Sequence, residues 1–464
     1  MSDALARAST VAFLLLAAAL PWSVAPISIA LVLCAALTLL VWGVRGAQAE
    51  GEARARWVST PVDLPALAWI AALAIASVFA VDPGQSWPRV AKGLLLLLVP
   101  VAAYHARDER IARRAVAILL VSAAAAAVFA LARFIAAGPE FPNRVRGAVG
   151  HPLTYGGQAL LLASLATAIA IRCRGRWRTG ALVALGVLLA ALAGTYTRSA
   201  WIGYVAAVAV IVAFTRARWL GAVAGGVAAL ALVMPGAYRA RALSIFDPQS
   251  PWNRERVHMW EAGVRMFRDH PWTGVGLQDL HSLYETYKPA GAVEPAGHLH
   301  SVYVQVAATM GVVGLAALVF LAAGLMRASS RALREARRSR PGAGPVASGA
   351  PLAISGAPRA PSGAPRAISR ENFAAAISLG VSAALAGFLV SGLMEWNLGD
   401  EELLDLLCVL VGIAFAAASW ARARHGTSDL EEGPALVERL PDQPLGASAN
   451  LRRNQATSGV SPTR

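Results

Sequence analysis

The sequence predicts an all-α polytopic membrane protein with about twelve transmembrane helices and one large loop on the outer face. The first observation is composition: 56% of the 464 residues are hydrophobic, 15% are charged, and the mean hydropathy is +0.53. A soluble domain would carry more charge. The second is that apolar residues come in blocks near the roughly 17–25 residues that cross a bilayer as a helix. The third is that basic residues gather in every second connection between these blocks.

Apolar blocks bounded by charged or turn-forming residues define the predicted spans. They run near Thr10–Leu20, Ile27–Val44, Leu64–Ala80, Val90–Tyr104, Ile111–Ile135, Leu153–Ile171, Gly180–Ala193, Ala200–Phe214, Leu220–Met234, Ser301–Leu325, Phe373–Leu393 and Leu403–Trp420. The first block is short and follows Arg7, as in a cleavable signal peptide. Apolar sequence resumes directly after Trp22, which favours a tight helical hairpin instead.

The arginines assign each connection to a side, because cytoplasmic loops are enriched in Lys and Arg. Basic clusters follow every second span and begin at Arg45, Arg107, Arg172, Arg216, Arg327 and Arg422. This pattern predicts that both termini are cytoplasmic. It also accounts for the net charge of +15, so we expect a lipid bilayer and no nucleic acid as a partner.

Five regions follow from this organisation. We expect N-terminal transmembrane helices at 1–140, a core at 141–325 that includes an outer loop at 235–297, and the last two transmembrane helices at 372–421. The segment 326–371 is rich in Pro, Gly, Ala and Ser and predicts a flexible cytoplasmic linker. The polar tail, 422–464, is predicted to be disordered.

The large outer loop contains an amphipathic pattern from Arg254 to Asp269, which the His270-Pro271 pair ends. The apolar stripe consists of Val257, Trp260, Val264 and Phe267. We therefore expect an ordered helical layer over the outer end of the bundle.

Arginines on the outer face are exceptions to the charge rule and need an explanation. They are Arg144, Arg146, Arg198, Arg254, Arg256, Arg265 and Arg268. Guanidinium groups in such a set fit a pyrophosphate, because each can bind two phosphate oxygens and stays charged. The alternative is ordinary snorkelling or pairing with nearby carboxylates.

Arg198 is the sharpest of these candidates. It lies in Gly194-Thr195-Tyr196-Thr197-Arg198-Ser199-Ala200-Trp201, a turn barely long enough to separate two spans. Such a turn holds the cation close to the bilayer surface, at the depth of a lipid-linked phosphate. A cation there is costly unless it is paired or functional.

His298 and His300 lie where the large loop returns to the membrane. A histidine, with an ordinary pKa of about 6.5, can accept a proton from an attacking hydroxyl or orient it. Structural hydrogen bonding and metal binding are the alternatives, and a metal would need further ligands. His151, Glu395 and Asp400 are weaker outer-face candidates, and either carboxylate can pair with an arginine.

Four sequence pieces, in this order, resemble the O-antigen ligase and O-antigen polymerase superfamily. They are Arg146-Gly147 followed by Gly150-His151-Pro152; Thr197-Arg198-Ser199-Ala200-Trp201; Arg256 and Trp260 running into Asp269-His270-Pro271-Trp272-Thr273-Gly274-Val275-Gly276; and His300-Ser301-Val302-Tyr303-Val304-Gln305 leading to Met310-Gly311. The resemblance covers roughly Arg144 to Leu318. One departure is Ser301, where the family commonly has Asn after its histidine.

The resemblance implies a GT-C-type glycosyltransferase of the bacterial inner membrane with a periplasmic active site. Such an enzyme takes a glycan from undecaprenyl pyrophosphate and joins it to a sugar hydroxyl of lipid A-core oligosaccharide, with inversion and without a cofactor or metal. Carried to this chain, the pyrophosphate-binding residues are Arg198, Arg256, Arg265 and Arg146, and the catalytic residue is His300 or His298. The family spacing favours His300.

Other functions remain open at this stage. The same domain serves O-antigen polymerases and protein O-oligosaccharyltransferases; the latter usually carry further periplasmic sequence, which ranks them third. A lipid-linked oligosaccharide flippase would also be basic and polytopic. Transporters place polar residues near the middle of the membrane, whereas most candidates here lie on one face.

Overall fold

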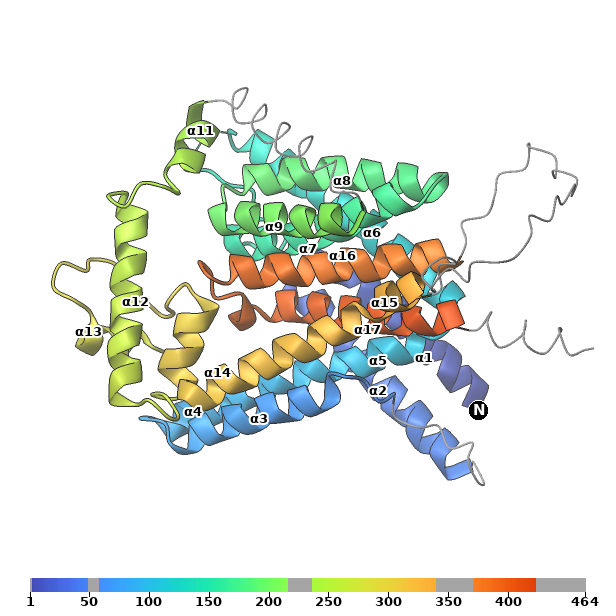
Figure 1. Ribbon diagram of the computed structural model, residues 1–464, viewed down its shortest axis with the longest axis horizontal. Helices are drawn as coiled ribbons and strands as arrows, with labels where there is room; N and C mark the ends of the chain where they lie inside the picture. Colours follow the sequence, from blue (N-terminus) through green and yellow to red (C-terminus); the bar gives the residue numbers. More distant parts are fainter. Residues whose placement is uncertain (1, 49–57, 140, 216–235, 339–369, 423–464) are drawn as a thin grey trace, which may run out of the picture. The chain divides into compact units, whose positions relative to one another are not determined.

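The computed structural model describes residues 2–48, 58–139, 141–215, 236–338 and 370–422, and the regular elements in these ranges are all helices (Figure 1). The long helices are α1 Ser2–Ala19, α2 Val24–Gln48, α3 Asp63–Val78, α6 Glu109–Ala136, α7 Pro152–Arg172, α8 Arg176–Gly194, α9 Arg198–Thr215, α12 Pro251–Asp269, α14 Val302–Ser329, α16 Arg370–Ser391 and α17 Glu401–Arg422. The shorter ones are α4 Pro83–Val90, η2 Ala91–Leu97, α5 Leu98–Ala106, α11 Gly236–Leu243, α13 His281–Tyr287, α15 Arg331–Arg338 and η3 Asn397–Gly399.

Within the described ranges, nine helical stretches are long and apolar enough to cross a membrane. They are Val24–Val44, Pro83–Ala106, Glu109–Ala136, Pro152–Arg172, Arg176–Gly194, Arg198–Thr215, Val302–Ser329, Asn372–Ser391 and Glu401–Trp420. The predicted spans at 10–20 and 64–80 fall on α1 and α3, and α3 has 16 residues. The predicted span at 220–234 lies outside the described residues. The all-α polytopic fold is confirmed, whereas the count of twelve spans stays a prediction.

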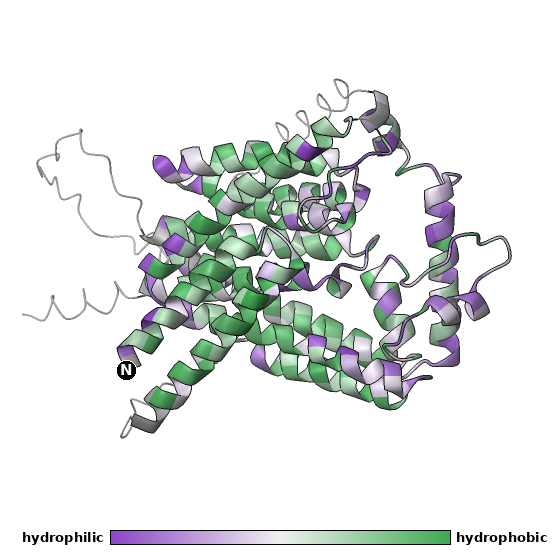
Figure 2. Cartoon of the chain, turned by 180° about the vertical axis from the view of Figure 1, so that it is seen from behind, coloured by the Kyte–Doolittle hydropathy of each residue, from purple (hydrophilic) through white to green (hydrophobic). Residues whose placement is uncertain are grey.

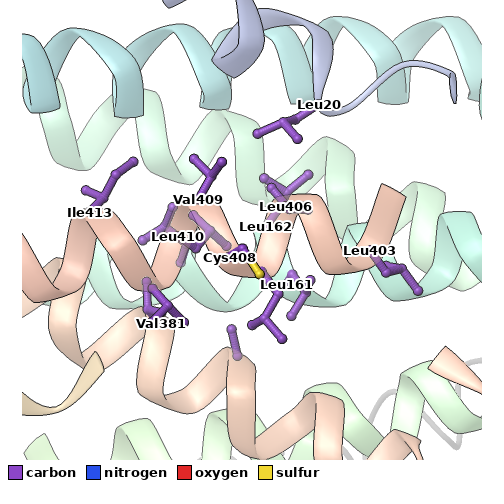
Figure 3. Close-up of a cluster of buried hydrophobic side chains, with 14 of the residues drawn as sticks. Leu20, Leu161, Leu162, Val381, Leu403, Leu406, Cys408, Val409, Leu410 and Ile413 are labelled. Atoms are coloured by element: carbon purple, nitrogen blue, oxygen red, sulfur yellow. The ribbon is translucent and has the colours of Figure 1, made fainter. Parts of the chain in front are cut away.

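Three helices form the centre of the bundle. Nearly every residue of α7, and most residues of α16 and α17, are buried, whereas α2 and α6 expose much of their apolar surface. Leu161 and Leu162 of α7 pack with Val381 of α16 and with Leu406 and Cys408 of α17 (Figure 3). An apolar helix buried on all sides belongs in the interior of a bundle, and exposed apolar faces suit lipid (Figure 2).

Two glycines set the approach of α9 to α16. A Cβ at Gly387 would collide with the carbonyl oxygen of Gly203, and one at Gly203 would lie 2.6 Å from the carbonyl oxygen of Gly387. Small residues of this kind let membrane helices pack backbone to backbone. The contact fixes the start of α9, at Arg198, relative to the end of α16, at Ser391.

A break in α14 holds the outer loop against the bundle. Gly311 has φ +62 inside this helix. The segment 271–276 fills the break: the backbone N–H groups of Val275 and Gly276 donate to Ala308 and Thr309, and the N–H of Val312 donates to Pro271. The interrupted helix thereby keeps its backbone groups hydrogen-bonded. Parts of the third and fourth sequence pieces, 269–276 and 310–311, thus have a structural explanation.

Helix α12 runs across the direction of the long helices at one end of the bundle, opposite the N-terminus (Figure 1). We call this the α12 end. The predicted amphipathic helix is confirmed, and it begins slightly earlier than predicted, at Pro251. Its buried face consists of Met259, Ala262 and Met266, which pack with Leu280, Tyr284 and Leu299. Val257 and Val264, from the predicted apolar stripe, are exposed instead, because the loop 275–299 packs on the adjacent face.

The first part of the predicted linker is helical. α14 continues to Ser329, and α15 follows at Arg331–Arg338. Leu333 of α15 is buried, and its N–H donates to the hydroxyl of Ser378 on α16. Residues 339–369 and the tail from 423 lie outside the described residues.

Candidate active site

The predicted site residues belong to separate parts of the chain and lie at the α12 end. Arg146 lies in the loop before α7, Arg198 begins α9, Arg256 and Arg265 lie on α12, and the two histidines precede α14. The geometry divides most of them into two groups. The histidine side comprises His298, His300, Glu395 and Arg256; the arginine side comprises Arg144, Arg198 and Arg241.

On the histidine side, His300 lies against a carboxylate. Its Nδ1 is 2.9 Å from Oε1 of Glu395, and its backbone has φ +46, a left-handed conformation that non-glycine residues rarely adopt. The ring of His298 stands edge-on to that of His300, with 4.2 Å between centroids. The backbone next to them is fixed, because the N–H of Leu299 donates to Gln305 at 2.8 Å. Strain of this kind is typical of functional positions.

Ser301 has a local structural role. It is the N-cap of α14, and its hydroxyl accepts from the backbone N–H of Val304 at 3.4 Å. Ser and Asn are both favoured at this position because their side chains satisfy free N–H groups. The departure from the family residue therefore keeps the helix start that presents His300.

Glu395 connects His300 to Arg256. Its side chain is almost fully buried, with 4% exposed, and its Oε2 accepts from a guanidinium nitrogen of Arg256 at 3.3 Å. The same guanidinium also donates to the carbonyl oxygen of Met394. Burial opposes ionisation of Glu395, but the hydrogen bond and charge of His300 and the charge of Arg256 lower its pKa to about 2.

The surroundings of His298 favour its neutral form. Burial lowers its pKa, and the neighbouring charge of His300 lowers it further. The two histidines therefore have different surroundings. Of the two, only His300 has a carboxylate within hydrogen-bonding distance among the described residues. This difference favours His300 as the working histidine.

On the arginine side, each guanidinium is held by neutral groups. Arg198 is 8% exposed and donates to the carbonyl and the hydroxyl oxygens of Ser244 at 2.9 and 3.1 Å. Arg144 donates to the carbonyl oxygen of Thr195 at 2.6 Å and to the hydroxyl of Thr197 at 2.9 Å. Arg241 donates to the carbonyl oxygen of Tyr196 at 3.4 Å. In the part of the chain that the structure describes, none of the three arginines forms an ion pair.

These arginines are close enough to affect one another. Burial, followed by the charge of Arg241, lowers the pKa of Arg144 to about 10, while the charge of Glu395 opposes the shift. Burial, followed by the charge of Arg256, also lowers the pKa of Arg241. They remain charged at neutral pH. Partly desolvated cations that repel one another, and that form no ion pair, are stabilised by binding an anion.

The tight turn before α9 positions this group. Tyr196 has φ +50 and is fully buried, with its ring stacked on that of Tyr238 at 4.4 Å. Because the turn reverses the chain within 195–197, its carbonyl groups point toward the guanidiniums of Arg144 and Arg241. The short loop recognised in the sequence therefore holds two further arginines besides Arg198.

The structure brings Arg146 to the edge of this region. Arg146 is exposed and lines a pocket of about 270 Å³ together with Arg133, Asn143 and Arg144. Its charge acts on Arg144 and on His151. It is thus close to the arginine side without belonging to its buried part.

Arg265 is not brought together with Arg256. Nine positions separate them on α12, which corresponds to about 13 Å along the axis and to opposite faces of the helix. The guanidinium of Arg265 donates to the carbonyl oxygen of Tyr287, the last residue of α13, at 3.3 Å. Its predicted role at the pyrophosphate is not explained by this position.

Asp400 is a second carboxylate near the histidine side, and its surroundings differ from those of Glu395. Its Oδ2 accepts from the hydroxyl of Thr154 at 2.9 Å. Burial, together with the charge of Glu395, raises the pKa of Asp400 to about 7, although the hydrogen bond from Thr154 opposes the shift. Burial lowers the pKa of His151, which caps α7 nearby. Asp400 therefore changes charge near neutral pH, unlike Glu395.

Among the described residues, His298, His300 and Glu395 could offer one ligand atom each to a metal, since these atoms lie within 4.8 Å of one another. The donor set fits a metal poorly. Glu395 is already hydrogen-bonded to Arg256, whose charge opposes a cation, and three ligands leave the shell of a structural site incomplete.

Two residues of this site were not assigned a central role from the sequence. Arg241 has no motif, although it is a further outer-face arginine under the same charge rule. Glu395 was a weak candidate for pairing with an arginine, and that pairing is observed. Its contact with His300, which lies 95 positions away, could not be predicted from the sequence.

The comparisons with known proteins agree with the resemblance seen in the sequence. Residues 183–319 match a family model described as O-antigen ligase. The matched range includes Arg198, α11, α12 and both histidines, whereas Arg144 and Glu395 lie outside it. A comparison with curated proteins finds no match.

Proposed function

Because residues 183–319 match a family model described as O-antigen ligase, we propose that this multi-pass membrane protein is an O-antigen ligase of the bacterial inner membrane. It transfers a glycan from undecaprenyl pyrophosphate to a sugar hydroxyl of lipid A-core oligosaccharide, on the periplasmic side, in lipopolysaccharide biosynthesis. The observation that carries the proposal is that the buried Arg198 and the partly buried Arg144 and Arg241 lie at the same end of the bundle as His300, which contacts a carboxylate.

The arginine side suits the donor. A glycosyl pyrophosphate is already activated, and negative charge accumulates on the pyrophosphate as the bond to the sugar breaks. Arg198 and Arg241, with Arg144, place fixed positive charge where this happens, and Arg256 adds a fourth guanidinium. Preorganised charge in a site shielded from water stabilises such a transition state strongly.

The histidine side suits the acceptor. The acceptor oxygen forms a bond to the anomeric carbon while the bond from that carbon to the pyrophosphate oxygen breaks. The hydroxyl proton passes to His300, and undecaprenyl pyrophosphate leaves with the bonding electron pair. Attack from the face opposite the leaving group inverts the anomeric configuration. His298 remains the second candidate for the proton acceptor.

The same reaction chemistry allows other members of the superfamily. An O-antigen polymerase extends the glycan, and a protein O-oligosaccharyltransferase modifies a protein. A deletion strain separates the first two. Accumulation of long polymer that is not joined to lipid A core supports a ligase, whereas core bearing one repeat unit supports a polymerase.

Purified protein in detergent gives the direct test. We expect it to join labelled undecaprenyl-linked glycan to lipid A core without added metal and in the presence of EDTA. Since detergent micelles enclose no compartment, product formation would also exclude a flippase. Failure to form product with any lipid A core acceptor, or restoration of a lost activity by one divalent ion, would contradict the proposal or its metal independence.

The periplasmic position of the site has its own test. The three native cysteines are buried, so an introduced cysteine reports accessibility by itself. Val293 is 82% exposed at the α12 end, and Thr179 is exposed near the start of α8, at the opposite end. A membrane-impermeant thiol reagent should label Val293→Cys but not Thr179→Cys in cells whose outer membrane is permeabilised. The reverse pattern would place the site in the cytoplasm.

A further inference from the structure

The loop between α16 and α17 carries a buried carboxylate, Glu395. Residues 392–400 cross the α12 end and bring Glu395 between two groups of the site. The loop is held to the start of α14, because the N–H of Val302 donates to the carbonyl oxygen of Gly392 at 2.8 Å. The amide of Asn397 also donates to the carbonyl oxygen of Phe388 at 3.4 Å. Glu395 thus extends from a backbone fixed on both sides.

We propose that Glu395 is a positioning residue that fixes the tautomer and orientation of His300 and at the same time orients Arg256. This inference rests on the proposed function, because it assigns His300 the acceptor proton. It adds a residue outside the 183–319 range to the machinery of the site.

The first argument concerns the proton on the imidazole. An ionised carboxylate can only accept a hydrogen bond, so the ring nitrogen at 2.9 Å from it, Nδ1 of His300, must carry a hydrogen. In the neutral ring the lone pair is then on Nε2. This nitrogen is the one left to take the proton of the acceptor hydroxyl.

The second argument concerns rotation. The ring of His300 is limited on one side by Glu395 and on another by His298, whose ring stands at 80° to it. The backbone N–H of Trp396 donates to the same oxygen, Oε1 of Glu395, at 3.2 Å. The carboxylate therefore has a fixed orientation, and its hydrogen bond fixes the orientation of the His300 ring.

The third argument concerns charge. A buried carboxylate with a single partner would pay a large desolvation cost. Glu395 has two partners: His300 at Oε1 and Arg256 at Oε2. When the imidazole takes the acceptor proton, the carboxylate stabilises the imidazolium; the proton later passes to water and the ring returns to its starting tautomer. The groups proposed to contact acceptor and donor thus share one anion.

The test compares Glu395→Gln with wild-type protein in the detergent assay. Glutamine keeps the shape but loses the charge, and its amide nitrogen can turn toward Nδ1 and favour the wrong tautomer. We expect kcat to fall on the order of 100-fold, within the range typical of general-base catalysis. The acidic limb of the pH–rate profile should also move to lower pH, because the imidazolium loses its partner.

Glu401→Gln is the matched control. Glu401 begins α17 only six positions later, is about half exposed, and pairs with Lys92 at 3.0 Å rather than with His300. It should keep both the rate and the pH profile. A Glu395→Gln enzyme with wild-type kcat, or with a reduced kcat and an unmoved acidic limb, would overturn the positioning role.

A measurement on wild-type protein covers the case in which Glu395→Gln does not accumulate. With ¹⁵N-labelled histidine, the ring nitrogens of His300 distinguish the two tautomers without any substrate. Protonated Nδ1 with unprotonated Nε2 at high pH supports the inference, and the opposite tautomer overturns it. Because this readout needs no transfer, it fails or succeeds independently of the proposed function.

Discussion

The arginine side and the histidine side solve the same problem, a buried charge, in opposite ways. On the histidine side the charges are already balanced, since Glu395 contacts both His300 and Arg256. On the arginine side, the hydrogen bonds of Arg198, Arg144 and Arg241 within the described residues go to neutral oxygens. The buried charge of the histidine side is therefore balanced within the protein. The arginine side has no paired anion in the described part of the chain, and a substrate can supply one.

The largest effect is expected on the histidine side. His300→Ala removes the proposed proton acceptor, and the neighbouring His298 lacks the carboxylate partner. We expect kcat to fall roughly 10²–10⁴-fold while the protein still accumulates in the membrane. His281→Ala, on the exposed start of α13, is the control and should transfer normally. Normal transfer by His300→Ala would remove the histidine side from the chemistry.

A smaller loss of activity is expected on the arginine side, because several guanidiniums are proposed to bind the same pyrophosphate. Arg198→Ala should lower kcat/KM on the order of 100-fold in the detergent assay, the loss expected when one of several charge-stabilising donors is removed. Arg198→Lys keeps the charge but not the planar pair of donors, so it should recover only part of the activity. Equal activity of the Ala variant and wild type would show that the group does not contact the donor.

Variants of two further arginines, Arg241 and Arg265, test which residues belong to the site. Arg241→Ala removes a partly buried member of the arginine side and should lower kcat/KM about 10-fold. Arg265→Ala removes an exposed side chain on the opposite face of α12, where a single polar contact is worth little, so the change should stay below about threefold. If Arg265→Ala were the more damaging variant, α12 would have to present its other face to the donor.

The smallest effect concerns stability. Asp400 has a pKa of about 7 in the folded protein against an ordinary 3.8, so it contributes stability below about pH 4 that is lost as pH rises through about 7. Asp400→Asn keeps an acceptor for Thr154 and cannot ionise. Its Tm should match wild type near pH 4 and exceed it by about 2 °C or more near pH 8. A Tm difference that does not change with pH would contradict this assignment.

Most of the fold could be predicted from the sequence, since hydropathy and length alone identify a membrane helix. The predicted blocks fall on helices such as α6 and α14 wherever the structure describes them. The break in α14 at Gly311 was not predicted, because it depends on 271–276 entering from a distant loop.

The site was partly predictable for the same reason. Arg198 and His300 lie next to span boundaries, where the sequence marks an unusual charge or polar residue. The partners of those residues, Ser244 and Glu395, are 46 and 95 positions away. A single sequence carries no record of such long-range contacts, so the division into two electrostatic sides needed coordinates.

The central claim is that the arginine side binds a lipid pyrophosphate. The most direct measurement is the affinity of the detergent-purified protein for undecaprenyl pyrophosphate itself, with wild type, Arg198→Ala and His300→Ala compared. We expect Arg198→Ala to bind at least about tenfold more weakly than wild type, whereas His300→Ala should bind as wild type does. Equal affinity of Arg198→Ala and wild type would contradict it.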